Sequence, residues 1–383
     1  MTTDKYAQDG VNVGEGDSFS EFAGNLCKQT YRNSPYIEVR DFSRGHFRGP
    51  RAFRLKNLPD DCWMDTAPDG DGTKVVLVDA AGDYEHASNG WVAMTGGDIT
   101  RWGGIPLVFV NNFDLNSLGE YGNPINQACR TMIAGLKQIA DRQRFVMYKG
   151  ETAELGECVG SENSSALVKY LWSGVAVGAY REKTIITGDQ VKEGMVVIAL
   201  REKGFRNNGI SSVRKAIRLA FGSDCYSNPE AKETIRKAAT PTVLYDLFLT
   251  TVNGWYAEDF QPIVPVHLIV HVTGGAIKSK LAKDILFPRG LSAHLDNLWG
   301  PPDIMRQCAE WRGLNDQEFY EIWNGGQGVL VVVEDNDRHV ADFFELAKTH
   351  GIEARVAGKI TKEPSPVVII ESKLNGETIK FTT

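Results

Sequence analysis

The sequence predicts an α/β or α+β protein with two domains, and three observations support this. The chain has 383 residues with 42% hydrophobic content, which exceeds the size of one typical domain. Short apolar runs typical of strands alternate with segments of helical period in both halves. Polar turn residues cluster between two strong strand patterns at 181–194, which predicts a boundary there. We therefore expect a two-domain enzyme with a cleft.

The expected division of the chain has three parts. Residues 1–55 are rich in Gly, Asp, Asn and Arg, which suits a mobile segment that orders around a ligand. A plain solvated loop is an equally good interpretation of that composition. Residues 56–185 are expected to form an N-terminal domain, and residues 186–383 a C-terminal α/β domain.

Seven runs have the pattern of strands. Each is short, rich in β-branched or other apolar residues, and bounded by turn-forming residues. They lie at 74–80, 105–113, 167–180, 193–200, 265–275, 328–334 and 366–372.

Three segments have the pattern of helices. The clearest covers 123–142, where Asn123 is a good N-cap, Pro124 occupies the first helical position, and apolar residues share one face. The other two, at 211–221 and 338–350, are each followed by a glycine that tolerates the left-handed conformation of a helix end.

Composition and charge restrict the class of protein. The net charge of -7 argues against a nucleic-acid or anionic-membrane partner, although small anions need only a local site. No apolar run approaches about 18 residues, and the start "MTTDKYAQDG" lacks the features of a signal peptide. The six cysteines are widely spaced without a C-x-x-C pair, which favours free thiols in a reducing cytosol. We expect a soluble, cytoplasmic protein.

The segment "DGDGTK" at 69–74 is the first candidate site. It fails as an EF-hand loop, because Thr73 and Lys74 occupy the fifth and sixth positions, and it does not match a Walker P-loop. Asp69 and Asp71 could hold Mg²⁺, while the glycines permit close approach of phosphate and Lys74 supplies positive charge. The alternative is an ordinary acidic, glycine-rich turn before a strand.

Further carboxylates and glycines occur in other segments. Asp98 follows two glycines in "AMTGGDITRWGG", and Glu151 and Glu154 lie on a glycine-led turn in "YKGETAEL". Such carboxylates suit a site where Mg²⁺ neutralises ATP phosphates. In the second half, "GFRNNGISSVR", "HVTGGAIKSKL" and "NGGQGVLVVV" could bind phosphate through exposed backbone N–H groups, or could simply be tight turns. His267 and His271 lie four apart in a strand pattern, which favours locally hydrogen-bonded histidines over metal ligands.

The order of these segments resembles the aminoimidazole ribonucleotide synthetase family, also called phosphoribosylformylglycinamidine cyclo-ligase. "YAQDGVNVGEGD" is similar to the family's Y-x-x-A-G-V-D-x-x-A-G, and "DGDGTK" to D-G-V-G-T-K with Asp71 in place of valine. "VAMTGGDITRWGGIPLVFVNN" places Asp98 on the family's Asp in V-A-M-C-V-N-D. "KGETAEL", "GFRNNGISSVR", "HVTGGAI" and "YEIWNGGQGVLVV" resemble G-G-E-T-A-E-M, G-x-H-S-N-G-Y-S-L-V-R, H-L-T-G-G-G and Y-R-T-F-N-M-G-I-G-M-V. The resemblance runs from about Tyr6 to the last strand.

The resemblance implies an ATP-dependent ring closure of formylglycinamidine ribonucleotide, with Mg²⁺ and ATP bound by the N-terminal domain. It also implies a homodimer in which the N-terminal sheets pair into a barrel. Asp69 and Asp98 would bind Mg²⁺, and Glu151 would help to organise the metal or nucleotide. Two further groups would contact phosphates or the reacting amide: Gly70, Gly72, Thr73 and Lys74 in the first half, and Asn208, Gly209, His271, Thr273 and Gly274 in the second.

The chain departs from the family pattern at the expected site. "DFSRGHFRGP" replaces G-G-F-G-x-L-F, Arg206 and Asn207 replace the His-Ser of H-S-N-G, and Gly97 replaces the Asn before Asp98. Asn111-Asn112 replaces an Asp-Tyr. Two alternatives therefore stay open: a related ATP-dependent phosphotransferase acting on another small substrate, and a catalytically silent nucleotide-binding homologue.

Overall fold

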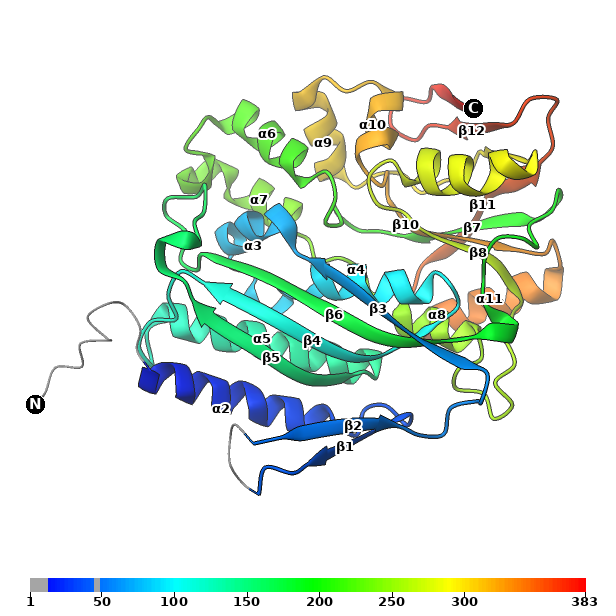
Figure 1. The fold of residues 1–383 in the computed structure, drawn as a ribbon. Coiled ribbons are helices and arrows are strands. Elements are labelled where there is room, and N and C mark those ends of the chain that lie inside the picture. The colour runs from blue at the N-terminus through cyan, green and yellow to red at the C-terminus, as the bar shows by residue number, and fades with distance from the viewer. Residues whose placement is uncertain (1–12, 45–48) are drawn as a thin grey trace, which may run out of the picture.

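The computed structural model describes residues 13–44 and 49–383 and contains two parts built on separate sheets (Figure 1). The N-terminal part has a four-stranded sheet in the order β3-β6-β4-β5, and the C-terminal part has a seven-stranded sheet in the order β13-β12-β9-β11-β7-β10-β8. The predicted mixed α/β fold with two domains is confirmed. The motif "YAQDGVNVGEGD" and the middle of "DFSRGHFRGP" lie partly outside the described residues.

The N-terminal sheet has helices on one face and is partly covered on the other. β3, β6 and β4 are antiparallel, and β4 pairs in parallel with β5, to which α5 connects it. The helix α4 packs on β3, β4 and β6, and α2 packs on α5 and β5. The hairpin β1-β2 lies beneath the other face (Figure 1). Bounds are α2 (Val13–Thr30), β1 (Ile37–Asp41), β2 (Arg51–Leu55), β3 (Cys62–Gly70), α4 (Asn89–Thr100), β4 (Ile105–Leu115), α5 (Pro124–Gln143), β5 (Val146–Glu154) and β6 (Tyr170–Arg181).

The C-terminal sheet is covered on both faces. One face packs on α6, α7, α9, α10 and the π-helix η7, and the other on α8 and α11. This burial explains why β10 is apolar throughout, since strands covered on both faces lose the alternating pattern. Bounds are β7 (Val196–Arg201), α6 (Ile210–Phe221), α7 (Lys232–Ala238), α8 (Asp246–Val252), β8 (Val266–His271), η7 (Ile277–Leu286), β9 (Ser292–Leu295), α9 (Asp303–Arg312), α10 (Asp316–Ile322), β10 (Gln327–Val333), α11 (Asp337–Thr349), β11 (Ala354–Thr361), β12 (Val367–Glu371) and β13 (Thr378–Thr382).

Most of the expected elements are present. Six of the strand patterns correspond to β4, β6, β7, β8, β10 and β12, and the three helix patterns to α5, α6 and α11. The start of α5 is as expected, because the Asn123 side chain accepts a hydrogen bond from the Ile125 N–H at 2.9 Å and proline follows the cap.

Two expectations about secondary structure were wrong. Residues 74–80 do not form a strand: after a short 3-10 turn, η1 (Gly72–Lys74), they form the helix α3 (Val75–Ala81). The first five residues of α3 are all buried, so the segment lacks the polar face that marks a helix in sequence. The segment 1–55 was expected to be a mobile segment, with a plain loop as the alternative, but its described part forms α2 and the hairpin, with Phe19 fully buried.

Two further features concern the whole described chain. Among residues 13–44 and 49–383, no helix is long and apolar enough to span a lipid bilayer. All six cysteines lie in these ranges and are free thiols, as their spacing predicted.

Candidate functional site

The carboxylates of Asp69 and Asp98 come from separate elements, and their charges interact. Asp69 is near the end of the edge strand β3, and Asp98 is in the last turn of α4. Burial raises the pKa of Asp69, the charge of Asp98 raises it further, and the Gly70 N–H and Lys280 oppose this. Two neighbouring carboxylates that repel each other form a site that a cation would stabilise.

This pair fits Mg²⁺ held together with a phosphate ligand. Mg²⁺ commonly takes one or two protein carboxylates and completes its octahedron with water and substrate phosphates. Within the described residues, no group of three or more His, Cys, Asp or Glu side chains could hold a metal ion. The donor set therefore suits a metal that arrives with a nucleotide.

The glycines before Asp98 lie inside α4, and the turn that was expected at Glu151 and Glu154 is instead part of the strand β5. A Cβ atom at Gly96 would lie 2.5 Å from Asp246 Oδ2, and one at Gly97 would lie 2.3 Å from His271 Cε1. These glycines allow α8 and the end of β8 to contact the helix directly. The packing places the His271 ring against Gly97 of α4.

Asp71 and Asn207, two departures from the family pattern, contact each other. Asp71 is buried, and its Oδ1 accepts hydrogen bonds from the Trp91 N–H at 2.8 Å and from Asn207 Nδ2 at 3.4 Å. Burial raises the pKa of Asp71 to about 7, and the bonds from Trp91 and Asn207 oppose the rise. Gly90 makes room, because a Cβ there would lie 2.4 Å from both side chains. The two departures thus form one contact between the N-terminal and C-terminal parts.

Lys74 is buried in the interface between the two parts. Its ammonium donates to the carbonyls of Phe205 at 2.7 Å and Thr240 at 3.0 Å, and to Thr242 Oγ1 at 3.2 Å. These bonds use all three N–H groups. Of its neighbours, Thr73 is exposed and Gly72 has a φ of 55°, with open space where a Cβ would be. In this arrangement Lys74 holds the two parts together, while Gly70, Gly72 and Thr73 remain near the end of β3.

Glu151 is not brought to Asp69 and Asp98. In the sheet register, Gly70 is opposite Ser173, Ser173 opposite Asn112, and Asn112 opposite Glu151. Three strand spacings separate Gly70 from Glu151, or about 14 Å. Glu151 instead lines a groove of about 660 Å³ between α2 and β5.

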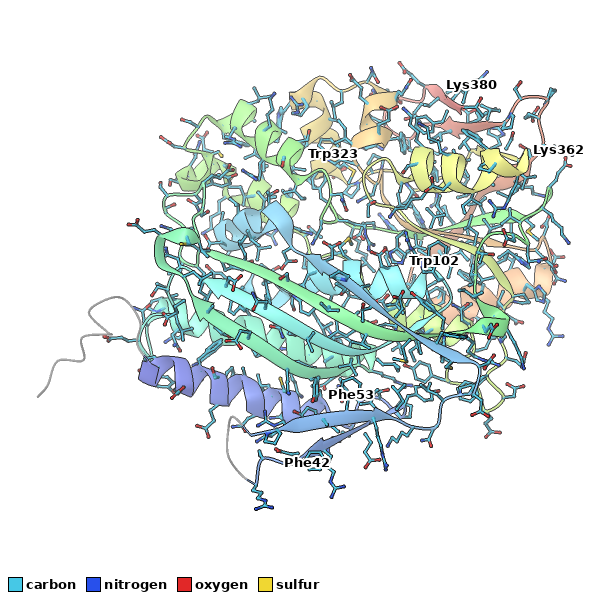
Figure 2. All side chains as sticks on the ribbon, in the orientation of Figure 1. Phe42, Phe53, Trp102, Trp323, Lys362 and Lys380 are labelled. Carbon is cyan, nitrogen blue, oxygen red and sulfur yellow. The ribbon has the colours of Figure 1, made fainter. Side chains whose placement is uncertain are left out.

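The candidate residues of the second half converge on α10 and the segment that follows it. Gly209 begins α6 with a φ of 73°, and its carbonyl accepts a hydrogen bond from Trp323 Nε1 at 3.1 Å. A Cβ at Gly274 would lie 2.3 Å from the Ile322 carbonyl and 3.7 Å from the Cβ of Asn208. Thr273 adjoins this group and hydrogen-bonds the carbonyl of His271 through its backbone N–H at 3.1 Å. Trp323, labelled in Figure 2, also limits the space at Gly209, where a Cβ would lie 2.7 Å from its Cδ1.

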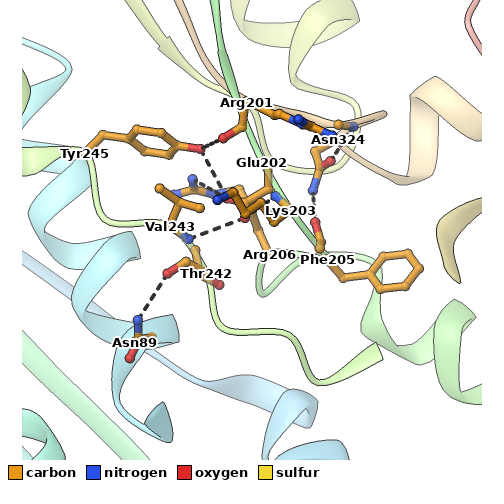
Figure 3. A network of polar contacts seen from close by, with 12 residues as sticks. Asn89, Arg201, Glu202, Lys203, Phe205, Arg206, Thr242, Val243, Tyr245 and Asn324 are labelled. Atoms are coloured by element: carbon orange, nitrogen blue, oxygen red, sulfur yellow. Dashed lines mark hydrogen bonds and ion pairs between the residues drawn. The ribbon is translucent and has the colours of Figure 1, made fainter. Parts of the chain in front are cut away.

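The sequence analysis missed the charged residues that surround the acidic pair. Arg206 is 1% exposed and its Nη1 lies 3.3 Å from Glu202 Oε2, which belongs to a larger polar network (Figure 3). Arg101 stacks on the Trp102 ring at 4.5 Å (Figure 2), and Lys280 projects from η7. Arg206 could have been found, because it occupies a motif position where the family has histidine. Arg101 and Lys280 lie at positions where no motif drew attention.

The proteins that this chain is similar to carry the same family name that the order of its motifs suggested. Residues 192–371 match the family described as AIR synthase related protein, C-terminal domain. Phosphoribosylformylglycinamidine cyclo-ligase of Thermodesulfovibrio yellowstonii is 29% identical over 367 residues, covering 93% of this chain and 96% of the relative. The enzyme of the same name from Staphylococcus aureus strain Newman is 28% identical over 370 residues, covering 95% and 97%.

Solved structures show the same fold at lower identity. Thiamine-monophosphate kinase from Stenotrophomonas maltophilia superposes with a TM-score of 0.56 at 14% identity, covering 92% of this chain and 95% of that one. The hydrogenase maturation protein HypE in complex with ATP gives a TM-score of 0.52 at 14% identity, covering 87% of each chain.

Proposed function

We propose that this protein is a cyclo-ligase of purine biosynthesis, because residues 192–371 match the AIR synthase related family and the whole chain is similar to phosphoribosylformylglycinamidine cyclo-ligases. The reaction is the ATP-dependent conversion of formylglycinamidine ribonucleotide to aminoimidazole ribonucleotide. The observation that supports the proposal beyond similarity is that Asp69, near the end of β3, and Asp98, in α4, carry charges that interact across separate elements.

The chemistry requires an activated amide. The formyl amide oxygen attacks the γ-phosphorus of ATP and ADP leaves, which converts a poor leaving group into a phosphate ester. An internal nitrogen then attacks the same carbon, the C–O bond breaks and inorganic phosphate departs as the imidazole ring closes. The protein must align the amide with the γ-phosphate and keep water out.

The candidate residues divide between these tasks. Asp69 and Asp98 would hold Mg²⁺, which neutralises phosphate charge when bound. Asn208, Gly209 and Gly274 form a glycine-rich surface at the start of α6, where backbone N–H groups can bind a phosphate ester. His271 packs against Gly97 of α4, and it is three positions before Gly274 in the chain. Burial, with the charges of Arg206, Lys280 and Arg101, holds its pKa well below 6.5, so its imidazole is neutral and offers one N–H.

We also propose that the chain forms a homodimer through the outer face of β3, β6 and β4. The hairpin β1-β2 covers only part of this face (Figure 1), and Leu171 is 52% exposed. An open depression of about 420 Å³ is lined by residues that include Pro68, Val110 and Val175. Exposed apolar surface of this kind marks an interaction site. Sedimentation velocity should show a dimer for the wild type and a monomer for Leu171→Asp, and a wild-type monomer at micromolar concentration would refute this assignment.

A cytoplasmic location and a reducing environment agree with this function. All six cysteines are free, and Cys27, Cys129, Cys225 and Cys308 are buried. Burial raises the pKa of the Cys27 and Cys129 thiols to about 12, which keeps them protonated and unreactive.

The test is direct turnover. Purified protein is mixed with formylglycinamidine ribonucleotide, ATP and Mg²⁺, and ADP and aminoimidazole are measured in the same samples. We expect ADP and imidazole to form in equal amounts. ADP release without imidazole would instead support a phosphotransferase with another acceptor, and nucleotide binding without ADP release would support a catalytically silent homologue.

A further inference from the structure

Three cationic side chains come from three separate segments. Arg101 follows the last turn of α4, with its Nε 3.5 Å from Asp98 Oδ1, Arg206 lies in the segment between β7 and α6, and Lys280 lies in η7. Their charges interact at Lys280: burial and the charges of Arg101 and Arg206 lower its pKa, while Asp98 and Asp284 oppose this. Gathering like charges in a poorly solvated place is unfavourable unless an anion compensates them.

Arg206 has hydrogen-bonding capacity that the protein leaves unused. Its side chain is 1% exposed, and only Nη1 contacts a carboxylate, at Glu202. Its Nε and Nη2 are buried and without a hydrogen-bond partner among the described residues. Glu202 is already bound by the N–H groups of Lys203 at 3.0 Å and Val243 at 3.3 Å (Figure 3). Leaving two guanidinium N–H groups buried and unpaired is costly, which indicates a ligand.

The neighbouring groups are similarly incomplete. Nε2 of His271 is buried without a partner, and so is Nε of Arg101, which lies 3.5 Å from Asp98 Oδ1 without hydrogen-bond geometry. The ammonium of Lys280 makes no hydrogen bond or ion pair with another described residue. Lys278, two positions earlier in η7, differs, since its ammonium pairs with Glu321 at 2.6 Å.

We propose that Arg101, Arg206 and Lys280 form an anion pocket at the junction of the two parts, and that its ligand is a phosphate group. Guanidinium groups present planar N–H forks that match phosphate oxygens, and a lysine adds a point charge. Arg206 stands where the family motif has histidine, so the pocket is a feature of this chain's own sequence. The anion pocket itself is inferred from the side chains, and only the identity of the ligand rests on the proposed function. On that function, the phosphate is either the γ-phosphate of ATP or the phosphate ester of the substrate.

The experiment measures binding and does not require turnover. The probes are the β,γ-imido analogue of ATP with Mg²⁺, and ribose 5-phosphate as a simple phosphate ester, each titrated by calorimetry into the full chain. The variants are Lys280→Gln and Arg101→Gln, with Lys283→Gln as the matched control. Lys283 is an exposed lysine of the same helix. Arg206→Lys keeps the charge but removes the fork, and thermal unfolding verifies that each variant is folded.

We expect a loss of roughly 10- to 100-fold in affinity for one probe in each pocket variant, the usual effect of removing a charged hydrogen bond, and no loss in the control. Weaker binding of the ATP analogue alone would identify the γ-phosphate, and weaker binding of ribose 5-phosphate alone the substrate ester. If Lys280→Gln and Arg101→Gln are folded and bind both probes like the wild type, the pocket does not exist. A wild type that binds neither probe also overturns the proposal. If the variants weaken binding as expected but the wild type forms no aminoimidazole ribonucleotide, the result counts against the proposed function only.

Discussion

Replacing Asp71 with asparagine should stabilise the protein, and more so at high pH than at low pH. The folded state raises the pKa of this carboxyl from 3.8 to about 7, chiefly by burial, so the folded protein keeps the proton to a higher pH than the unfolded chain. Stability is therefore lost as pH rises from about 4 to about 7 and is constant above that range. The asparagine side chain does not ionise, and its oxygen can still accept the hydrogen bond from the Trp91 N–H.

The magnitude follows from the size of the shift. A difference of roughly 3 pKa units corresponds to about 4 kcal/mol when the group is ionised in both states, and to about 2 kcal/mol near pH 5. Urea unfolding of the wild type and Asp71→Asn at about pH 5 and pH 8.5 should therefore give free-energy differences that change by roughly 2–3 kcal/mol. Asp246, whose pKa burial also raises to about 7, is present in both proteins and cancels. An equal difference at both pH values would refute the reasoning, and the exposed Asp60→Asn serves as control.

Three further substitutions test the remaining assignments. Asp69→Asn should lower kcat by at least ~100-fold and raise the Mg²⁺ concentration needed for half-maximal activity, because one of two metal carboxylates is lost; an unchanged Mg²⁺ dependence would remove Asp69 from the metal site. Lys74→Met should destabilise the fold by roughly 3–5 kcal/mol in urea unfolding, since it removes one member of a buried, hydrogen-bonded charge network. A stable variant that had lost only ATP affinity would instead restore Lys74 as a phosphate ligand. Gly97→Ala should lower the free energy of unfolding by about 1–3 kcal/mol and reduce activity, because the new methyl group displaces His271. The control is Gly16→Ala, which should not destabilise the protein, because nothing lies within 4 Å of the new methyl group.

The sequence predicted elements best where capping or turn residues mark their ends. The helix at 123–142 and the strand at 105–113 were correct, because capping residues or bounded apolar runs mark them clearly. The helix α3 was mistaken for a strand, since a short helix buried on nearly all sides has no period to detect. Likewise, Gly96 and Gly97 indicated a turn, although their role is to admit Asp246 and His271 against α4.

The candidate site was predictable in part, through motif order. That order pointed to Asp69 and Asp98, which the structure places together, and to Asn208 and Gly274, which adjoin each other. No spacing in sequence could show that Asp71 contacts Asn207, because 136 residues separate them and each is unusual only by itself. The same limit applies to Lys280, which becomes notable only when the fold brings Arg101 and Arg206 beside it.

The position of Lys74 has a consequence for how the two parts can move. Its ammonium, at the start of α3, is anchored by three acceptors that all belong to the C-terminal part. Separating the two parts at this point would break all three hydrogen bonds of a buried ammonium group together. Such a motion has a high energetic barrier. The α3 end of the junction therefore stays closed, and any relative movement of the two parts would have to leave these three hydrogen bonds intact.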